Sequence, residues 1–318
     1  MNTDGAPDLS QVIAGVVFKN PVIAASGTFG YGREYGELID LSRLGGICTK
    51  GLTLRPRTGN TGQRIHETPA GLLNSIGLEN PGIPAFIEKE LPRLRELGPV
   101  VIANLSGSTV EEYAEGAALL NDAAIDMIEL NISCPNVKAG GMTFGLDPEA
   151  AVSVVGPVRK AAPDKPLAVK LSPNAPDLAA VARACVRAGA DALSLVNTFK
   201  AMAIDIRRRR PVFANVSAGL SGPAVRPIAL RMVWELYGAL REPGAAAVPL
   251  IGMGGIAGAE DALEFLMAGA SAIQIGSATF PHPQTMIETI DGLKVFMEKE
   301  GIKNLAELNI RGGAEKTA

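Results

Sequence analysis

Short apolar segments recur along the chain and alternate with stretches in which apolar residues return every three or four positions. The short segments are nearly continuous in apolar character, which is typical of parallel strands buried on both faces. The longer stretches have the periodicity of amphipathic helices. Eight segments are predicted strands, at residues 21–25, 46–50, 100–105, 127–132, 167–171, 192–197, 249–252 and 272–276.

Capping residues mark several of the predicted helices. Asp177 precedes a stretch whose apolar residues share one face, and Gly189 stands where that helix would end. Thr109 and Glu112 have the spacing of a capping box. Eight strands that alternate with helices, without a linker-like segment, predict a closed (β/α)8 TIM barrel that forms a single domain over residues 1–318. An open doubly wound sheet is the alternative fold.

Two intervals between predicted strands are too long for simple connections. They cover residues 51–99 and 198–248, and both contain runs rich in glycine, proline and asparagine. Long segments after strands two and six of a barrel would lie over the carboxyl ends of the strands, where barrel enzymes bind their substrates. We therefore expect insertions after strands two and six that help to form the site.

Composition narrows the function classes. The 318 residues carry 30 Lys and Arg against 33 Asp and Glu, so the formal net charge is −3 and gives no electrostatic support for binding nucleic acid or an anionic membrane. No apolar run reaches the ~18 residues that a membrane helix needs, and the first residues lack the pattern of a signal peptide. The 3 cysteines are too few and too scattered for a disulfide framework or a metal site. A cytoplasmic protein is expected.

Polar residues follow the predicted strands where each strand ends, which predicts a polar ring above an apolar barrel. The residues at these positions are Ser26, Lys50, Asn104, Asn131, Cys134, Lys170, Asn197, Thr198, Gly254, Gly255, Gly276 and Ser277. Lys50 and Lys170 occupy equivalent places, where a lysine could form a Schiff base or stabilise an anion. The alternative is that these lysines extend to solvent and have no chemical role.

Glycine-rich segments after strands seven and eight suggest a phosphate site. Gly252-Met253-Gly254-Gly255 and Gly276-Ser277 would let backbone N–H groups approach a phosphate, although such glycines can also simply form turns. The first segment matches a dinucleotide-binding fingerprint, but the acidic residue that such a site needs on the next strand is missing. A dinucleotide site of that type is therefore rejected.

Cys134 is the candidate catalytic residue, because it stands at a strand end before the glycine-hinged loop 135–145. Neither His66 nor His282 has an obvious claim as its partner, so a Cys–His dyad is unsupported. Cys48 and Cys185 are expected to be inert core residues. The run Arg207-Arg208-Arg209-Arg210 is best read as a solvated loop, and its role is left open.

Several motifs together resemble the dihydroorotate dehydrogenase family, over essentially the whole chain and in the same order. They are Lys50-Gly51, Asn74-Ser75-Ile76-Gly77-Leu78, Asn131-Ile132-Ser133-Cys134-Pro135-Asn136, Val196-Asn197-Thr198, Gly219-Leu220-Ser221-Gly222 and Gly252-Met253-Gly254-Gly255. The chain looks most like the class 1B catalytic subunit. The indications are a cysteine where class 2 has serine, no class 2 membrane helix at the N-terminus, and Asn80-Pro81-Gly82 after the Asn74 motif.

The resemblance implies an FMN-dependent oxidation of (S)-dihydroorotate to orotate in pyrimidine biosynthesis, with 1–318 as a single FMN-binding domain. Cys134 would be the base that removes the C5 proton. The residues implied to bind substrate are Lys50, Asn74, Ser75, Ile76, Gly77, Leu78, Asn131, Asn197 and Thr198. Those implied to bind FMN are Ser26, Lys50, Gly51, Asn104, Asn131, Lys170, Val196, Gly222, Gly254, Gly255, Gly276 and Ser277.

Class 1B resemblance also implies a partner. Electrons would pass to NAD through a second subunit that carries FAD and a 2Fe-2S cluster, in a heterotetramer built on a homodimer of this chain. One alternative is a class 1A-like homodimer that uses fumarate. Others are a non-redox barrel enzyme with a Schiff-base lysine, and a barrel that binds a phosphorylated ligand without catalysis.

Overall fold

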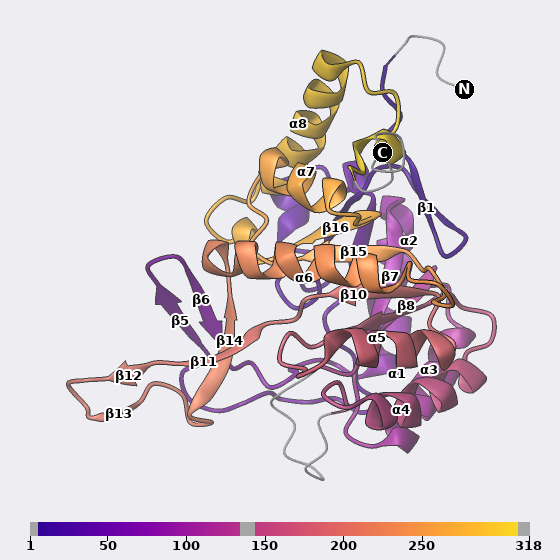
Figure 1. The fold of residues 1–318 in the computed structure, drawn as a ribbon. Coiled ribbons are helices and arrows are strands. Elements are labelled where there is room, and N and C mark those ends of the chain that lie inside the picture. The colour runs from indigo at the N-terminus through magenta and orange to yellow at the C-terminus, as the bar shows by residue number, and fades with distance from the viewer. Residues whose placement is uncertain (1–5, 134–143, 311–318) are drawn as a thin grey trace.

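The computed structural model describes residues 6–133 and 144–310 of the chain. Its centre is a closed barrel of eight parallel strands in the order β10-β15-β16-β3-β4-β7-β8-β9 (Figure 1). The barrel strands are β3 (Val22–Ala24), β4 (Gly46–Cys48), β7 (Val100–Leu105), β8 (Met127–Asn131), β9 (Leu167–Lys170), β10 (Ala192–Leu195), β15 (Leu250–Met253) and β16 (Ala272–Ile275). Seven of them lie within predicted segments, and β15 extends one residue beyond the predicted segment 249–252, so the barrel is confirmed and the open sheet is excluded.

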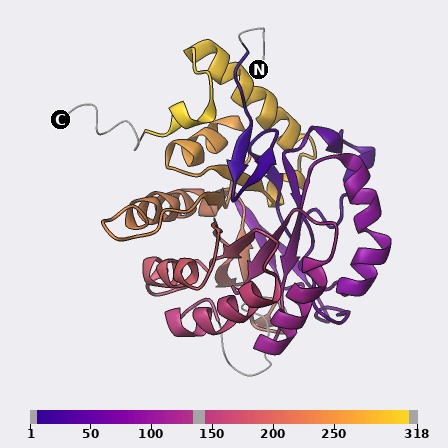
Figure 2. The same cartoon turned by 90° about the vertical axis from the view of Figure 1, so that its right-hand side faces the viewer.

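Helices surround the barrel (Figure 2). They are α1 (Ile83–Lys89), α2 (Leu91–Leu97), α3 (Val110–Asn121), α4 (Pro148–Ala161), α5 (Leu178–Arg187), α6 (Arg226–Ala239), α7 (Ala259–Met267) and α8 (Thr285–Glu300). The Asp177 side chain caps α5 by accepting from the N–H of Ala180 at 2.8 Å, and Thr109 caps α3 by accepting from Glu112 at 3.2 Å. Both predicted caps are confirmed. No helix in the described residues has the length and apolar character needed to cross a membrane.

The N-terminal hairpin closes one end of the barrel. It consists of β1 (Gln11–Ile13) and β2 (Val16–Phe18), which pair in antiparallel fashion. Ile13 and Phe18 of this hairpin are fully buried in one cluster with Ile23, Ile102 and Ile251 of the barrel strands. Because this end of the barrel is filled with apolar side chains, it leaves no room for a ligand there, and the site lies at the opposite end.

The other end carries a four-stranded sheet built from two distant segments. Strands β5 (Ile65–Thr68) and β6 (Gly71–Asn74) lie between β4 and β7 in the chain, whereas β11 (Phe199–Met202) and β14 (Ser217–Ser221) lie between β10 and β15. They pair in the order β11-β14-β6-β5, and Figure 1 shows this sheet on the side away from β1. The two long segments after the second and sixth barrel strands thus form one structure.

A further hairpin extends from this sheet. It consists of β12 (Ile204–Asp205) and β13 (Arg210–Pro211), and the turn between them carries the arginine run. All four arginines are exposed, and the Asp205 carboxylate accepts from the backbone N–H groups of Arg207 and Arg208.

Two glycines, one after α7 and one inside α4, test the packing around the barrel. Gly269 follows α7 with φ +110°, and a Cβ added there would lie 2.0 Å from Cδ2 of Tyr237. We expect Gly269→Ala to lower the free energy of unfolding by at least about 2 kcal/mol, because left-handed strain and overpacking add. Gly156, inside α4, has open space around its Cβ position. Gly156→Ala should change the free energy of unfolding by less than about 1 kcal/mol, because the gain in helix propensity is offset by crowding of the new methyl group against Pro157. Urea denaturation followed by circular dichroism measures both, and equal effects of the two changes would contradict the packing described.

Candidate active site

A cavity of about 840 Å³ lies between the carboxyl ends of the barrel strands and the four-stranded sheet. This volume is within the range of small-molecule and cofactor sites. The cavity is lined by all but two of the residues singled out from the sequence, namely Ser26, Lys50, Gly51, Asn74, Ile76, Gly77, Leu78, Asn104, Asn131, Lys170, Val196, Asn197, Thr198, Gly222, Gly254, Gly255, Gly276 and Ser277. The structure therefore brings together residues that are more than two hundred positions apart in the chain.

Two of the predicted site residues are not among those that line the cavity. Ser75 is buried beside it, where the Asn60 side chain donates to its hydroxyl at 3.1 Å. Cys134 lies outside the described residues, and so does most of the loop that follows it.

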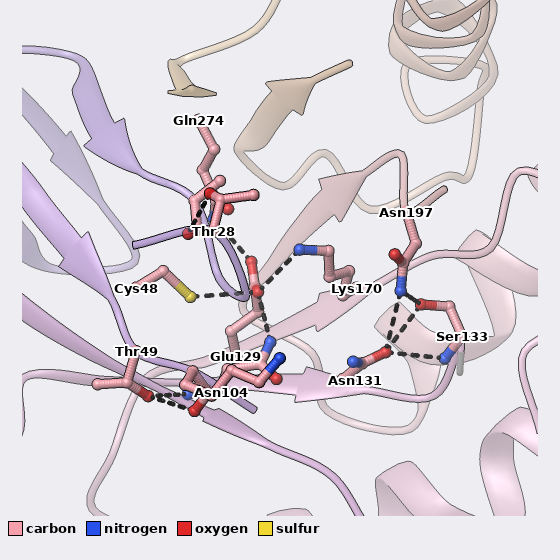
Figure 3. Close-up of polar contacts among 12 residues, drawn as sticks. Thr28, Cys48, Thr49, Asn104, Glu129, Asn131, Ser133, Lys170, Asn197 and Gln274 are labelled. Carbon is pink, nitrogen blue, oxygen red and sulfur yellow. Dashed lines mark hydrogen bonds and ion pairs between the residues drawn. The ribbon is translucent and has the colours of Figure 1, made fainter. Parts of the chain in front are cut away.

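Three polar residues form a cluster on one wall of the cavity. The Oδ1 atom of Asn131 accepts from the Ser133 hydroxyl at 2.8 Å, from the Ser133 N–H at 3.2 Å and from the Asn197 amide at 3.4 Å (Figure 3). Asn197 Nδ2 also donates to Ser133 Oγ at 2.6 Å. Because Asn131 Oδ1 is surrounded by protein donors, the NH2 group of Asn131 remains to donate to a carboxylate or carbonyl in the cavity.

The sheet supplies part of the opposite wall. Asn74 ends β6 and donates through Nδ2 to the Gly219 carbonyl of β14 at 3.2 Å, so the two insertions are joined beside the cavity. The following turn places Leu78 at φ +56°, an unusual conformation for a leucine that places its side chain at the cavity. The pairing of β6 with β14 thus positions a segment that the sequence could only identify by its motif.

A buried carboxylate lies at the base of the cavity. Glu129 of β8 is 1% exposed. Its Oε1 accepts from Asn104 Nδ2 at 2.7 Å and from Cys48 Sγ at 3.2 Å, and lies 3.3 Å from Lys170 Nζ (Figure 3). Its Oε2 accepts from Gln274 Nε2 at 2.7 Å. The five residues come from β8, β7, β4, β9 and β16, so this one side chain joins five barrel strands.

The surroundings of Glu129 determine its protonation. Burial by itself raises the pKa of this carboxyl group, but the Lys170 ammonium, followed by the polar side chains of Ser194, Gln274 and Cys48, more than offsets it, and the pKa lies below its ordinary value of 4.5. Burial first, and then the Glu129 charge, hold the pKa of the Cys48 thiol well above 9.0. Glu129 is therefore an anion at neutral pH, and Cys48 stays a thiol that donates to it. Within the described part of the chain, no group of acidic, His and Cys side chains is arranged to hold a metal ion.

Sequence reasoning missed Glu129 and Gln274. Each is a single polar residue inside an apolar segment that the structure buries completely. A charged side chain in a strand buried on both faces is rare unless it is paired, and that rarity is the signal that could have identified it. Cys48 is a buried core residue as expected, but it is also a hydrogen-bond donor to this carboxylate.

Glycines form a narrow corner at the other end of the cavity. Gly254 has φ +125° and Gly255 has φ +77°, so both adopt left-handed conformations that side chains disfavour. A Cβ on Gly255 would lie 2.8 Å from the Gly222 carbonyl oxygen, and one on Gly254 would lie 2.8 Å from the Ala229 Cβ. Gly276 and Ser277 lie at the same end. The backbone can approach a ligand closely here, as phosphate recognition requires.

A parallel barrel with a polar cavity over the carboxyl ends of its strands is the architecture of a barrel enzyme. Comparison with known proteins defines the family. A family model described as dihydroorotate dehydrogenase matches residues 8–297. The catalytic subunit of dihydroorotate dehydrogenase B (NAD(+)) from Petrotoga mobilis is 57% identical over 301 residues, which cover 95% of this chain and 98% of that protein. The chain belongs to the dihydroorotate dehydrogenase family.

Other relatives carry the same description. The catalytic subunit of dihydroorotate dehydrogenase B (NAD(+)) from Geotalea daltonii is 53% identical over 95% of this chain and 97% of that protein. The corresponding subunit from Alkaliphilus metalliredigens is 51% identical over 93% of this chain and 96% of that protein. The similarity therefore extends over the barrel and both insertions.

The ion pair of Glu129 and Lys170 gives a prediction for stability. We expect Lys170→Met to lower the free energy of unfolding by about 3–5 kcal/mol at pH 8, because it leaves a buried carboxylate without its counter-ion. In the wild-type protein, the pKa of Glu129 is lower in the folded state than in the unfolded state, where it is near 4.5. Ionised Glu129 therefore stabilises the folded state fully above this unfolded pKa, and the stabilisation is lost as the pH falls through the folded pKa.

In Lys170→Met, the stability should depend on pH in the opposite direction. Without Lys170, burial raises the pKa of Glu129, so the folded state takes up a proton and the loss of stability should be smaller at pH 5 than at pH 8. Denaturation at the two pH values measures this difference. Lys294→Met is the control, because Lys294 forms an exposed pair with Glu298 at 3.9 Å and should cost less than about 0.5 kcal/mol. If the loss of stability in Lys170→Met does not depend on pH, Lys170 is not the counter-ion that keeps Glu129 ionised.

Proposed function

We propose that this chain catalyses the oxidation of (S)-dihydroorotate to orotate in pyrimidine biosynthesis, with FMN as its cofactor. Residues 1–318 then form a single FMN-binding domain. The observation that carries the proposal is the cavity itself. Apart from Ser75, the residues that the family resemblance assigns to substrate and cofactor line this one space, although they come from eight strand ends and two insertions. Membership of the dihydroorotate dehydrogenase family supports the same reading.

The cavity is suited to FMN in three respects. Its glycine corner at Gly254 and Gly255 offers the close backbone approach that a phosphate needs. Its base holds two buried amide oxygens, on Asn104 and Gln274, that have no hydrogen-bond partner among the described residues. Its volume of about 840 Å³ accommodates a ring system together with a small substrate.

In this proposal, the substrate is held by amide side chains. Asn131 and Asn197 offer donors and acceptors whose directions are fixed by Ser133, and Asn74 approaches from the sheet. Dihydroorotate presents a carboxylate and a ring of alternating N–H and C=O groups, and asparagine matches such edges. Lys50 at the cavity wall supplies a positive charge beside them. We assign substrate binding to Lys50, Asn74, Ser75, Ile76, Gly77, Leu78, Asn131, Asn197 and Thr198.

The reaction removes a proton from C5 and a hydride from C6 of the substrate. We assign the proton to Cys134, which directly follows Ser133 in the sequence after β8. Bound FMN would supply the acceptor for the hydride. Lys170 provides a cation beneath the site, which stabilises negative charge that develops on a neighbouring group.

For Lys170, one of the two candidate lysines, the Schiff-base alternative is disfavoured by one observation. Lys170 is 5% exposed and its Nζ is paired with Glu129 at 3.3 Å, so this amine serves as a counter-ion in the core. A lysine nucleophile needs an uncharged amine that can reach a carbonyl carbon. The buried pair favours an electrostatic role instead.

The visible spectrum tests the function and the base together. We expect purified protein to be yellow and to bleach on anaerobic addition of dihydroorotate. Cys134→Ala should retain FMN but reduce it roughly 10²–10⁴-fold more slowly, as expected for loss of a general base. Cys185→Ala, a change of a buried cysteine on α5, is the control and should bleach at the wild-type rate. A colourless wild-type protein that binds no FMN would refute the function, and near-normal bleaching of Cys134→Ala would refute the base.

We also propose that electrons leave through a partner. The relatives are named as catalytic subunits of an NAD(+)-linked enzyme. In this proposal, a homodimer of the chain binds two subunits that carry FAD and a 2Fe-2S cluster, and these pass electrons to NAD. We further propose that the enzyme works in the cytoplasm, and the free thiols of Cys48 and Cys185 are compatible with a reducing compartment.

Steady-state assays separate this assembly from a fumarate-using homodimer. We expect the isolated chain to turn over poorly with fumarate and not at all with NAD, and the addition of the iron–sulfur flavoprotein subunit to confer NAD reduction. Full turnover of the isolated chain with fumarate, together with no NAD reduction after addition of the partner, would show that the fumarate-linked alternative is correct.

A further inference from the structure

Two buried amide oxygens at the base of the cavity have no hydrogen-bond partner within the described residues. They are Oδ1 of Asn104 and Oε1 of Gln274, on side chains that are 0% and 1% exposed. Both residues line the cavity. Buried carbonyl oxygens are nearly always satisfied in folded proteins, so a pair of unsatisfied acceptors beside a cavity indicates a ligand that donates to them.

The orientation of both amides follows from Glu129. An ionised carboxylate can only accept hydrogen bonds, so each amide must turn its NH2 group toward Glu129 and its oxygen away from it. The contacts agree, because Asn104 Nδ2 lies 2.7 Å from Oε1 and Gln274 Nε2 lies 2.7 Å from Oε2 (Figure 3). The Lys170 ammonium keeps the carboxylate ionised, and it contacts Oε1, the same oxygen atom that accepts from Asn104.

We propose that Glu129 is a positioning residue that fixes the hydrogen-bonding polarity of the cavity base, and that Gln274 joins Asn104 in recognising a ring N–H group of the cofactor. This inference rests on the proposed function, and it names the part of FMN that is recognised. The oxidised flavin ring has one N–H group, at N3, and one N–H can be shared by two acceptor oxygens as a bifurcated hydrogen bond.

The substrate also carries N–H groups, but the position of the acceptors favours the flavin. Asn104 and Gln274 belong to barrel strands β7 and β16 and are buried at the base of the cavity. The amides assigned to the substrate lie on the wall formed with Ser133 and on the four-stranded sheet. The two sets of residues are therefore on different parts of the cavity surface.

The test compares FMN with 3-methyl-FMN, in which a methyl group replaces the N3 proton. Dissociation constants are measured by flavin fluorescence on protein that has been stripped of flavin and shown to be folded by circular dichroism. We expect wild-type protein to bind 3-methyl-FMN about 10- to 100-fold more weakly, because the analogue leaves buried acceptors without a donor. Equal affinities, within about twofold, would overturn the inference.

Variants then test the role of Glu129. In Glu129→Gln, the new amide can donate as well as accept, so Asn104 and Gln274 are free to turn, and the preference for FMN should fall to about threefold or less. Glu79→Gln is the control, since Glu79 forms an exposed pair with Arg64 at 2.6 Å, and it should retain the wild-type preference. A wild-type preference in Glu129→Gln would overturn the inference.

A second variant serves if Glu129→Gln does not fold. Gln274→Met keeps the volume of the side chain but removes one acceptor, and should lower the preference for FMN severalfold. An unchanged preference in Gln274→Met would overturn the inference. The two proposals fail in different ways, because wild-type protein that binds no FMN refutes the function, whereas protein that binds FMN without preference over 3-methyl-FMN refutes only this inference.

Discussion

The buried ion pair of Glu129 and Lys170 is the constraint on which the interior of the barrel depends. A carboxylate at 1% exposure is stable only if its charge is balanced and its oxygen atoms are satisfied, and this one achieves both through Lys170, Asn104, Cys48 and Gln274. Those partners come from different strands. The relative positions of the strands therefore determine how the side chains that face the cavity are oriented around the pair. Stability and recognition are therefore set by the same contacts.

Along the barrel axis, the apolar packing that stabilises the fold and the polar groups that face the cavity lie at different ends. At one end, the β1–β2 hairpin and apolar strand residues such as Ile23 and Ile251 pack without polar groups. At the other end, the layer at Glu129 is polar, and above it the cavity is closed by the four-stranded sheet. The apolar layer beneath Glu129 keeps water away from the buried charge. On its other side, the cavity leaves room for a ligand that can hydrogen-bond to the unsatisfied amide oxygens. The order of layers along the barrel supplies both.

Amide orientation is a recurring device in this site. Ser133 directs Asn131 and Asn197 on one wall, and Glu129 directs Asn104 and Gln274 at the base. An asparagine or glutamine can present either a donor or an acceptor, so it is selective only when a neighbour fixes its rotation. The site uses a hydroxyl for this purpose on the wall and a carboxylate at the base. The Asn131 NH2 group on the wall is left to donate, and the Asn104 and Gln274 oxygens at the base are left to accept.

The sequence alone determined the eight strands and the caps at Asp177 and Thr109, and all but two of the site residues that it predicted line the cavity. It could do so because strands buried on both faces are continuous apolar runs, and because polar residues at their carboxyl ends stand out against those runs. The tertiary structure alone decided that β6 pairs with β14, since nothing local relates residues so distant in the chain. It also decided the role of Glu129 and Gln274, because a single polar residue in an apolar strand acquires its meaning only from the partners that the closed barrel places around it.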